Sequence, residues 1–384
     1  MVGARRVFIV NEHWGFVDNA RGRTNDEFSS IGKRGNGMAL LIKADELKGL
    51  FSIPEAIAAV RDGFRDQGEK PAYSAPRIRI QHEDRRVSVH PGGCHRLQVA
   101  GTFIHVERFT FQGGAQQYEK AGKRVYVAYD SETAELKTII VGSLPLFDEP
   151  PEDWFGTETA ITGAVGTDIL ARPDCRKLGL YGTGRQARRH LVTMCTIRPS
   201  IDEVRVYSRS AENRMAFVER MQPQVRARLT PVASPDEAAR EVDLICLATG
   251  SNVPVLFGDW LSAGQHVTSI VASNKGVLQQ GSVARPRREF DDAVIARADR
   301  VIATLKQQAI MDEQADLFEP VEKGIISWDK IGDLGELVTG KVPGRLSSGE
   351  ITVFKQNSDQ GVGFMALAKL AHEKAAACGR GIEI

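Results

Sequence analysis

Cysteine is scarce in this sequence, and its few copies are not arranged as metal ligands. The 384 residues contain five cysteines, an odd number, and none of them form the closely spaced pairs of a zinc site. A disulfide-stapled secreted fold is therefore not indicated. We predict reduced thiols in a cytoplasmic protein that binds no metal.

Long apolar runs and an excess of either charge are also lacking. No run approaches the ~20 apolar residues that a membrane-spanning helix needs. No apolar segment follows the basic residues near the N-terminus, so no secretory signal is predicted either. The 50 Lys and Arg residues balance 49 Asp and Glu residues, which leaves a formal net charge of +1. This balance gives no reason to expect a nucleic-acid-binding face or a membrane partner.

The most informative motif present is a glycine turn between an apolar run and a helix. Residues 178–181 form a short strand-like run, and a helical stretch follows the turn. Gly182 lets the chain turn sharply off the strand, Gly184 lets the backbone approach a pyrophosphate, and Ala187 keeps the helix close to the sheet. The helix N-terminus offers free N–H groups to phosphates. The predicted cofactor-binding residues at this turn are Gly182, Thr183, Gly184, Gln186 and Ala187.

Further strand-like runs follow at regular intervals and favour a parallel sheet. Residues 201–207, 242–248 and 266–272 are apolar and alternate with helical stretches. Thr249 comes directly after the second of these runs, at the carboxyl edge where ligands bind in open α/β sheets. The fold predicted is α/β, with a Rossmann-type doubly wound parallel sheet.

A second group of strands precedes the glycine turn and predicts a second, α+β domain with a mainly antiparallel sheet. The expected strands are 39–42, 77–81, 86–90, 98–107, 124–130 and 136–141, with a loop at 111–117. A helix over 157–171 is expected to link the two domains. The predicted division is an N-terminal arm over 1–38, a substrate-binding and dimerisation domain over 39–155 and 306–384, and a dinucleotide-binding domain over 156–305.

The end of the second strand of the dinucleotide unit bears on the choice of cofactor. An NAD site usually places an acid there, whereas this chain has Ser208, Arg209 and Ser210. The guanidinium and the two hydroxyls are suited to a 2′-phosphate. The sequence therefore predicts a preference for NADP(H), with NAD(H) still possible. The alternative is that Arg209 is an ordinary solvated arginine.

These motifs together resemble the ornithine cyclodeaminase/μ-crystallin family. The resemblance extends over residues 39–384 and is strongest from 176 onward. It is carried by Gly182-Thr-Gly184-Arg-Gln186-Ala187, Val204–Arg209, Asp243–Thr249 with Pro254–Leu256, Trp260–Val267, Gly340–Arg345 and Ile351–Lys355. The resemblance implies a homodimer, and a first domain that forms the substrate pocket.

The family's site residues carry over unevenly. Pro76 and Arg77 match a proline–arginine element, so the resemblance implies that Arg77 holds the substrate carboxylate; a surface ion pair is the alternative. Thr159 matches a residue that could contact the cofactor. The family's arginine before it is replaced by Glu158, which could bind an amino group of the substrate or could pair within its own domain. The family's strand lysine falls on Thr102 or Phe103, and the cyclodeaminase aspartate falls near Ser273, so both are absent.

These replacements favour hydride transfer over cyclodeamination, because hydride transfer asks mainly for orientation of the nicotinamide. We expect an imine reductase or amino-acid dehydrogenase acting on a small carboxylate-bearing imine or amino acid. The alternatives are a cyclodeaminase-like lyase with recycling NAD, and an NADPH-binding protein with little turnover. The proton donor is expected to be His90 or His105, with Glu107 and Lys275 as further candidates.

Overall fold

The computed structural model describes residues 38–384 except 71–74, 113–114, 148–155 and 358–360. Met38–Ile384 forms one compact unit, and the predicted N-terminal arm lies outside the described residues except for its last residue, Met38. Among the residues described, no helix combines the length and the apolar character that crossing a bilayer requires.

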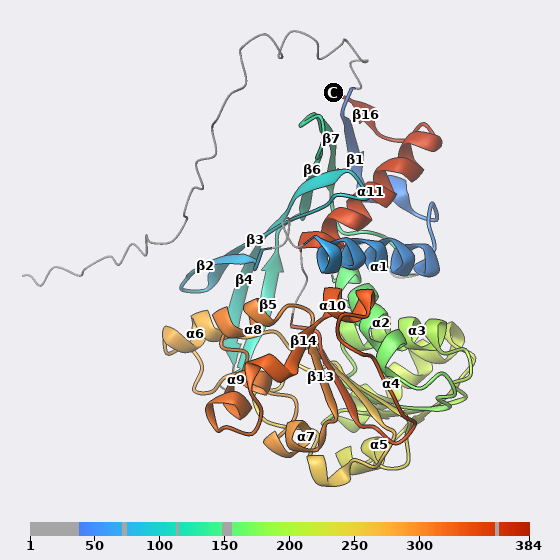
Figure 1. The fold of residues 1–384 in the computed structure, drawn as a ribbon, viewed down its shortest axis with the longest axis vertical. Coiled ribbons are helices and arrows are strands. Elements are labelled where there is room, and N and C mark those ends of the chain that lie inside the picture. Colours follow the sequence, from blue (N-terminus) through green and yellow to red (C-terminus); the bar gives the residue numbers. More distant parts are fainter. Residues whose placement is uncertain (1–37, 71–74, 113–114, 148–155, 358–360) are drawn as a thin grey trace, which may run out of the picture. The chain divides into compact units, whose positions relative to one another are not determined.

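A wholly parallel sheet of eight strands forms one half of this unit (Figure 1). Its order is β10-β9-β8-β11-β12-β15-β13-β14, so the strand order reverses between β8 and β11. Ligands bind at such a switch point in doubly wound sheets. The strands are β8 (Lys177–Tyr181), β9 (Glu203–Tyr207), β10 (Arg228–Pro231), β11 (Leu244–Leu247), β12 (His266–Ser269), β13 (Arg300–Ala303), β14 (Ile331–Asp333) and β15 (Thr352–Lys355). This confirms the predicted Rossmann-type sheet.

The second sheet is mainly antiparallel, as predicted. It runs β16-β1-β7-β6-β4-β3-β2, with β5 paired to β4, and only β1 and β7 are parallel. The strands are β1 (Leu40–Lys43), β2 (Ile78–His82), β3 (Arg85–Cys94), β4 (Val99–Gln112), β5 (Ala115–Ala121), β6 (Val125–Asp130), β7 (Leu136–Val141) and β16 (Ile382–Glu383). The loop expected at 111–117 is therefore wrong, because β4 and β5 extend into it as a hairpin.

Three long helices contribute most of the packing between and around the sheets. α1 (Ile53–Glu69) begins at Ser52, whose hydroxyl accepts a hydrogen bond from the Glu55 N–H. α2 (Thr157–Leu170) is buried along nearly its whole length. The first eight residues of α11 (Gly361–Ala377) are buried as well, whereas its C-terminal half carries charged residues that are partly or fully exposed. α11 packs against β3, β4 and β6, and α1 packs against α11 (Figure 1).

Shorter helices complete the two halves. They are α3 (Arg185–Ile197), α4 (Ala211–Met221), α5 (Pro235–Ala239), α6 (Lys275–Gln279), α7 (Asp292–Arg297), α8 (Lys306–Met311), α9 (Ala315–Glu322) and α10 (Leu334–Thr339). Single 3-10 turns occur at Ala44–Leu47, Gln222–Gln224, Gly258–Trp260 and Trp328–Lys330. One apolar core joins the antiparallel sheet to α1, α2 and α11, and two further cores include side chains of the parallel sheet.

Residues 306–384 are shared between the two sheets, which differs from the predicted division. α11 and β16 lie with the antiparallel sheet, as expected. β14 and β15, however, belong to the parallel sheet, where β15 is inserted between β12 and β13. The apolar side chains of β15 are fully buried there, which is typical of a central strand covered on both faces.

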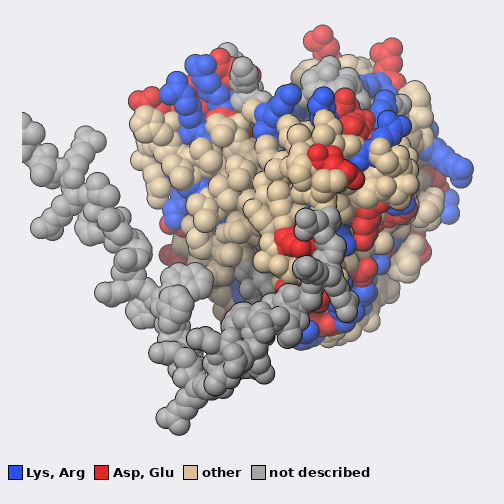
Figure 2. Space-filling model, turned by 90° about the horizontal axis from the view of Figure 1, so that it is seen from above, with Lys and Arg blue, Asp and Glu red and all other residues tan. Residues whose placement is uncertain are grey.

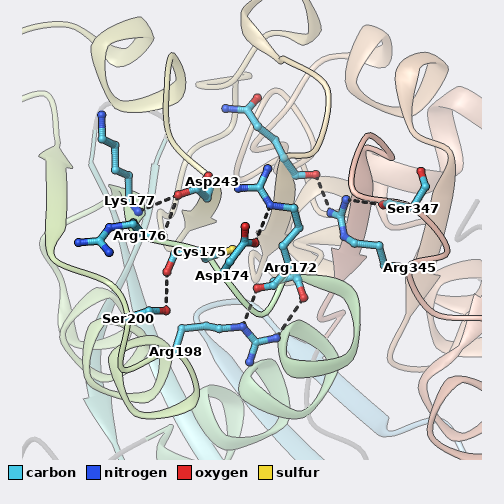
Figure 3. Close-up of polar contacts among 12 residues, drawn as sticks. Arg172, Asp174, Cys175, Arg176, Lys177, Arg198, Ser200, Asp243, Arg345 and Ser347 are labelled. Atoms are coloured by element: carbon cyan, nitrogen blue, oxygen red, sulfur yellow. Dashed lines mark hydrogen bonds and ion pairs between the residues drawn. The ribbon is translucent and has the colours of Figure 1, made fainter.

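Two arginines hold the C-terminal end of α2, where carbonyl groups have no partner within the helix. Arg198 donates to the carbonyl oxygens of Asp168, Ala171 and Arg172, at 2.7 to 3.0 Å. Arg345 donates to the carbonyl oxygen of Leu170 at 2.7 Å. Figure 3 shows the two side chains approaching this end from different elements. Because Arg198 directly follows α3, the end of α2 is fixed to the dinucleotide-binding half.

Asp243 extends this set of contacts to the first strand of the dinucleotide unit. Its Oδ2 accepts hydrogen bonds from the N–H groups of Arg176 and Lys177 at 2.8 and 2.9 Å, and its Oδ1 binds Arg172 at 2.5 Å (Figure 3). The start of β8 is thereby held beside the start of β11.

The face of the antiparallel sheet that points away from α11 is apolar. Ile80 is 64% exposed, Ile78 56% and Val106 48%. The strand register aligns β-branched side chains in cross-strand rows, of which one is Ile78, Val89, Ile104, Val125 and Val141. Elsewhere, on the face seen in Figure 2, acidic and basic side chains are interspersed around uncharged areas. Exposed apolar sheet faces are typical of surfaces through which proteins associate.

Candidate active site

The glycine turn has the geometry that the sequence predicts. Gly182 adopts φ +105°, and a Cβ at this position would overlap the carbonyl oxygen of Ala248. Both facts restrict the position to glycine. Gly184 precedes α3 with no side-chain cap, and a Cβ there would meet only open space. The first N–H groups of α3 therefore face an accessible volume, as an anion site requires.

The buried carboxylate of Glu289 holds the carboxyl ends of β11 and β12. Its Oε1 accepts from the N–H and the hydroxyl of Thr249 at 2.7 and 2.8 Å. Its Oε2 accepts from the N–H groups of Ile270 and Val271, both at 3.0 Å, and from the Ser269 hydroxyl at 2.7 Å. Five donors on one carboxylate fix the segments that line the switch point.

A buried cation balances this carboxylate. The ammonium of Lys355, on β15, lies 2.6 Å from Asp316 Oδ2 and 2.8 Å from the Ser269 hydroxyl. Asp316 Oδ1 in turn accepts from the Glu289 N–H at 2.9 Å. Burial raises the pKa of Glu289, and Asp316 adds to this, whereas Lys355 opposes it. A charged group with no water access needs such partners.

A cavity of about 360 Å³ opens between the two sheets at this edge. The dinucleotide-binding half contributes residues that follow β8, β11 and β12, together with Arg287 and Gln356. The antiparallel half contributes charged and aromatic side chains from β2, β3 and β4, and α2 and α11 complete the lining. The residues that bear on function are Arg79, Arg86, His90, Phe103, His105, Glu107, Glu158, Thr159, Gly184, Gln186, Thr249, Arg287 and Phe364.

Strand alternation explains why so many polar groups of the antiparallel half share one face. In the β3–β4 register Arg86 lies opposite Glu107, and His90 lies opposite Phe103. His105 is two residues from each of its neighbours on this face, so all five side chains point the same way. The imidazole rings of His90 and His105 stack with their centroids 5.4 Å apart.

Burial and pairing set the charges on this face. Burial lowers the pKa of His105 below its usual value, against the nearby Glu107 carboxylate, which raises it. Burial alone would raise the pKa of Glu107, but hydrogen bonding to His105 and the charge of Arg86 lower it overall. His105 Nε2 lies 3.5 Å from Glu107 Oε1, and Arg86 Nε donates to Glu107 Oε2 at 3.1 Å. At neutral pH the face thus carries an ionised Glu107–Arg86 pair beside a neutral His105.

Aromatic rings form the floor of the cavity. The Phe103 ring stacks on Phe364 of α11, with centroids 3.9 Å apart and planes 8° from parallel. Tyr126 lies beside Phe103, and its hydroxyl donates to the carboxylate of Glu158 at the start of α2. This packing excludes water below the polar face and fixes where Glu158 points.

The residues at the switch point fit a dinucleotide. The helix N-terminus at Gly184 would hold a pyrophosphate, and the segments after β11 and β12 would line the place of a ring next to His90. Comparison with known proteins supports this fit. The sequence profile of the ornithine cyclodeaminase/mu-crystallin family matches residues 156–377.

The chain belongs to this family. A Δ1-pyrroline-2-carboxylate reductase of Bacillus cereus is 31% identical over 352 residues, which cover 90% of this chain and 99% of that protein. Among solved structures, the Δ1-pyrroline-2-carboxylate reductase of Thermococcus litoralis, in complex with NADH and L-proline, has a TM-score of 0.73 at 24% identity. The match covers 90% of this chain and all of that one. An archaeal alanine dehydrogenase dimer with bound NAD has a TM-score of 0.72 at 22% identity, over 90% and 98% of the two chains.

The structure brings most of the sequence-predicted residues of this family member to the cavity. His90, His105, Glu158 and Thr159 line it from one side. Gly184, Gln186 and Thr249 line it from the other. Gly182 supplies the turn, Thr183 lies half-buried between the glycines, and Ala187 is buried under α3. The Thr249 hydroxyl donates to Glu289, so its lone pairs, not its proton, face other groups.

Arg77 is placed differently from the prediction. Its guanidinium is fully buried, is ion-paired with Asp312 and donates to the Asn357 carbonyl oxygen at 3.3 Å. It does not line the 360 Å³ cavity, but it lines a neighbouring cavity of about 510 Å³. Lys275, the further proton-donor candidate, is also outside the 360 Å³ cavity and lies 2.6 Å from Glu313 Oε1. The sequence motif is present, and the charge of Arg77 is paired with Asp312.

The three residues after β9, which are Ser208, Arg209 and Ser210, differ in what their side chains contact. The Ser208 hydroxyl donates to the Ser210 carbonyl oxygen at 3.1 Å, and the Ser210 hydroxyl accepts from the Asn213 N–H as the N-cap of α4. The exposed side chain of Arg209 makes no hydrogen bond or ion pair with the described part of the chain. Of the three, Arg209 has the side chain that is open to a ligand.

Sequence reasoning missed several residues of the site. Arg79, Arg86 and Arg287 line the cavity, and Glu289 positions its far wall. The period-2 pattern from Arg86 through Ser88 to His90 could have revealed Arg86. Nothing in the local sequence marks Glu289, because its partners come from two other strand ends.

Proposed function

We propose that this protein is a nicotinamide-dependent reductase that acts on the C=N bond of a small carboxylate-bearing imino acid, or in reverse on the amino acid. The observation that carries the proposal is the cavity itself, in which the dinucleotide-binding edge of one sheet faces His90 and His105 of the other. Membership of the family and the similarity to a Δ1-pyrroline-2-carboxylate reductase support this assignment.

Residues of this chain take defined parts in the reaction. A reduced nicotinamide, when bound, supplies the hydride that the imine carbon accepts. His90 supplies the proton that the imine nitrogen needs, and His105 with Glu107 holds the neighbouring ring in place. Glu158, oriented by Tyr126, binds the developing ammonium group. Phe103 and Phe364 exclude water beneath the reacting carbon.

We also propose that NADP(H) is preferred, with Arg209 holding the 2′-phosphate. The support is the absence of an acid from residues 208–210 and the open guanidinium of Arg209. A homodimer built on the apolar face of the antiparallel sheet belongs to the same proposal, since that face aligns β-branched rows from five strands. The cytoplasmic location predicted from the cysteine content stays a prediction.

The reaction is tested with the purified protein, NADPH or NADH, and Δ1-pyrroline-2-carboxylate or 2-oxo acids with ammonia or methylamine. Loss of absorbance at the nicotinamide band that requires the imine supports reduction. Ammonia release from ornithine without net cofactor change would instead indicate the lyase. Tight NADPH binding with neither reaction would indicate a binding protein.

Variants then test the proton donor. His90→Asn is expected to lower kcat by about 100-fold, within the range of general acid catalysis, with little change in cofactor Kd. His82→Asn, an exposed histidine on β2, serves as the control with unchanged kcat. An unchanged kcat for His90→Asn would remove this residue from the mechanism.

A further inference from the structure

A second cavity, of about 510 Å³, continues from the proposed active site. It lies along β2 and the segment 273–280, and it shares Arg79 and Arg86 with the 360 Å³ cavity. The two arginines therefore stand where the two spaces meet. Beyond them, Gln81, Gln279 and Gln280 add amide groups to a lining that also includes the charged residues Arg77, Lys275 and Asp312.

Most cations around this junction already have a carboxylate. Arg86 is paired with Glu107, Arg77 with Asp312, and Lys275 with Glu313. Each of these pairs includes a direct contact between charged atoms. An additional anion would gain little at these three positions, because it would compete with a carboxylate of the protein.

Arg79 is the exception among these four cations. Its closest carboxylate is Asp312, whose Oδ2 lies 3.9 Å from Nη1 and is the same oxygen that binds Arg77. The only hydrogen bond of its guanidinium within the described structure goes from Nη1 to the Ser273 carbonyl oxygen at 3.3 Å. Its Nε is buried and has no described partner. The side chain is 19% exposed, so solvent screens the charge only in part.

The electrostatic environment of Arg79 also favours a bound anion. Burial and the charges of Arg77 and Arg86 lower the pKa of Arg79 well below its usual value. A bound anion would stabilise the cation, since it adds the counter-charge that the protein does not provide.

We infer that Arg79 binds the substrate carboxylate at the junction of the two cavities, and that the substrate carries a polar extension that occupies the second cavity. The inference rests on the proposed function and defines its substrate class. That class is an open-chain imino acid longer than a pyrroline ring, with hydrogen-bonding groups on its extension. In this assignment the arginine that binds the carboxylate is Arg79, two residues after Arg77.

The first test compares substrates in the wild-type protein. The imines that ammonia forms with pyruvate, 2-oxoglutarate and 2-oxoadipate are compared with those of pyruvate with methylamine, glycine or 4-aminobutyrate, and with Δ1-pyrroline-2-carboxylate. At least one extended compound is expected to exceed the pyrroline ring tenfold or more in kcat/KM. A preference for the ring or for the pyruvate–ammonia imine would overturn the extended substrate class.

The second test uses Arg79→Gln and Arg79→Lys, with Arg85→Gln as an exposed control on β3. Arg79→Gln should raise KM for every carboxylate substrate by about 10- to 100-fold, consistent with loss of a charge-assisted hydrogen bond. The lysine variant should recover part of this loss. Cofactor Kd and the unfolding transition should remain as in the wild type. An unchanged KM in Arg79→Gln would contradict the inference that Arg79 binds the substrate carboxylate.

Calorimetric titration with L-glutamate and L-alanine separates this inference from the proposed reaction. Binding that needs Arg79 but gives no turnover with any imine would uphold the anion site and reject the reductase. Turnover that ignores Arg79 would uphold the reductase and reject the anion site. Absence of both binding and turnover would reject both.

Discussion

The side-chain amide of Gln186 donates a hydrogen bond to the carbonyl oxygen of Gly156, at 3.1 Å. One residue is in the first turn of α3, beside the glycine turn, and the other immediately precedes α2. The bond therefore ties the expected phosphate site to the helix that presents Glu158 and Thr159. Together with Arg198 and Arg345 at its other end, it fixes α2 to the dinucleotide-binding half at both termini.

Gly156→Ala is expected to disturb this junction by two routes. Gly156 has φ +81°, and an added Cβ would overlap the Gln186 amide nitrogen. We expect unfolding free energy to fall by about 2–3 kcal/mol, of which about 1–2 kcal/mol is backbone strain. Chemical denaturation measures this loss.

The control for that variant is Gly281→Ala. Gly281 has φ +75°, but a Cβ added there would meet nothing within 4 Å, so this variant reports backbone strain alone. The overlap itself is tested by the double variant Gly156→Ala/Gln186→Ala, whose loss should be less than the sum of the single losses. Additive losses would show that the two residues do not interact.

Arg209→Ala should weaken the binding of NADPH much more than the binding of NADH. Loss of its charge-assisted hydrogen bonds to a 2′-phosphate is expected to raise the Kd for NADPH by about 10- to 100-fold, while the Kd for NADH changes less than twofold. Fluorescence titration with each cofactor gives both values. Arg226→Ala removes another exposed arginine nearby in the sequence and should leave both affinities unchanged. Equal losses for NADPH and NADH in Arg209→Ala would contradict the proposed preference.

Stability should fall in mild acid because of His190. Burial, together with Arg189, lowers the pKa of His190 to about 4, against a hydrogen bond with the Gln186 carbonyl oxygen. The unfolded chain takes up a proton below about pH 6.5, whereas the folded chain does so only near pH 4. The stabilising contribution is therefore complete above pH 6.5 and is lost as pH falls from there toward 4.

Between pH 7 and pH 5 this loss amounts to about 2 kcal/mol for His190 alone. Denaturant titrations at the two pH values give the unfolding free energy of the wild type and of His190→Gln. The contribution of His190 is the difference between the two proteins in how much that free energy falls. His82→Gln, at an exposed position, should retain the wild-type pH dependence. If His190→Gln retains it as well, His190 does not cause the acid sensitivity.

The apolar sheet face predicts the oligomeric state. Ile80→Asp places a charge among the aligned β-branched residues and should shift a dimer toward monomer in analytical ultracentrifugation, since a buried unpaired charge is costly. Met215→Asp, on α4, introduces the same charge at a residue that is 61% exposed and should not change the sedimentation. A monomeric wild type, or a dimer unaffected by Ile80→Asp, would contradict the proposed interface.

Local patterns in the sequence predicted the elements well where chemistry and periodicity agree. Gly182 requires a positive φ and a close backbone approach, and both requirements can be read from a glycine between a strand and a helix. The strand faces of β3 and β4 likewise follow from alternation. The place of β15 between β12 and β13 could not be predicted, because strand order depends on long-range packing and not on the strand's own residues.

Prediction of the candidate site is limited in the same way, because contacts between residues far apart in the chain determine it. Arg77 and Arg79 are two residues apart, and the Pro76–Arg77 element of the sequence pointed to Arg77 alone. The ion pair of Arg77 with Asp312 could not be predicted from that element, because Asp312 is 235 residues away from Arg77 in the chain. The serines around Arg209 present a similar case, because the Ser210 hydroxyl caps α4 and Ser208 binds a carbonyl oxygen. Residue type indicates what a group can bind, and its neighbours in space determine what it does bind.

The central position of β15 has a consequence for synthesis on the ribosome. Until residues 352–355 have left the exit tunnel, β12 and β13 cannot acquire the strand that pairs with both of them. Lys355 is part of that strand, so Asp316 and Ser269 also lack their cationic partner until the strand has emerged. The nascent chain therefore exposes two unpaired strand edges late in translation, which favours mispairing with other chains. We expect release of the finished chain, not completion of the glycine turn, to be the step after which this protein first binds its cofactor.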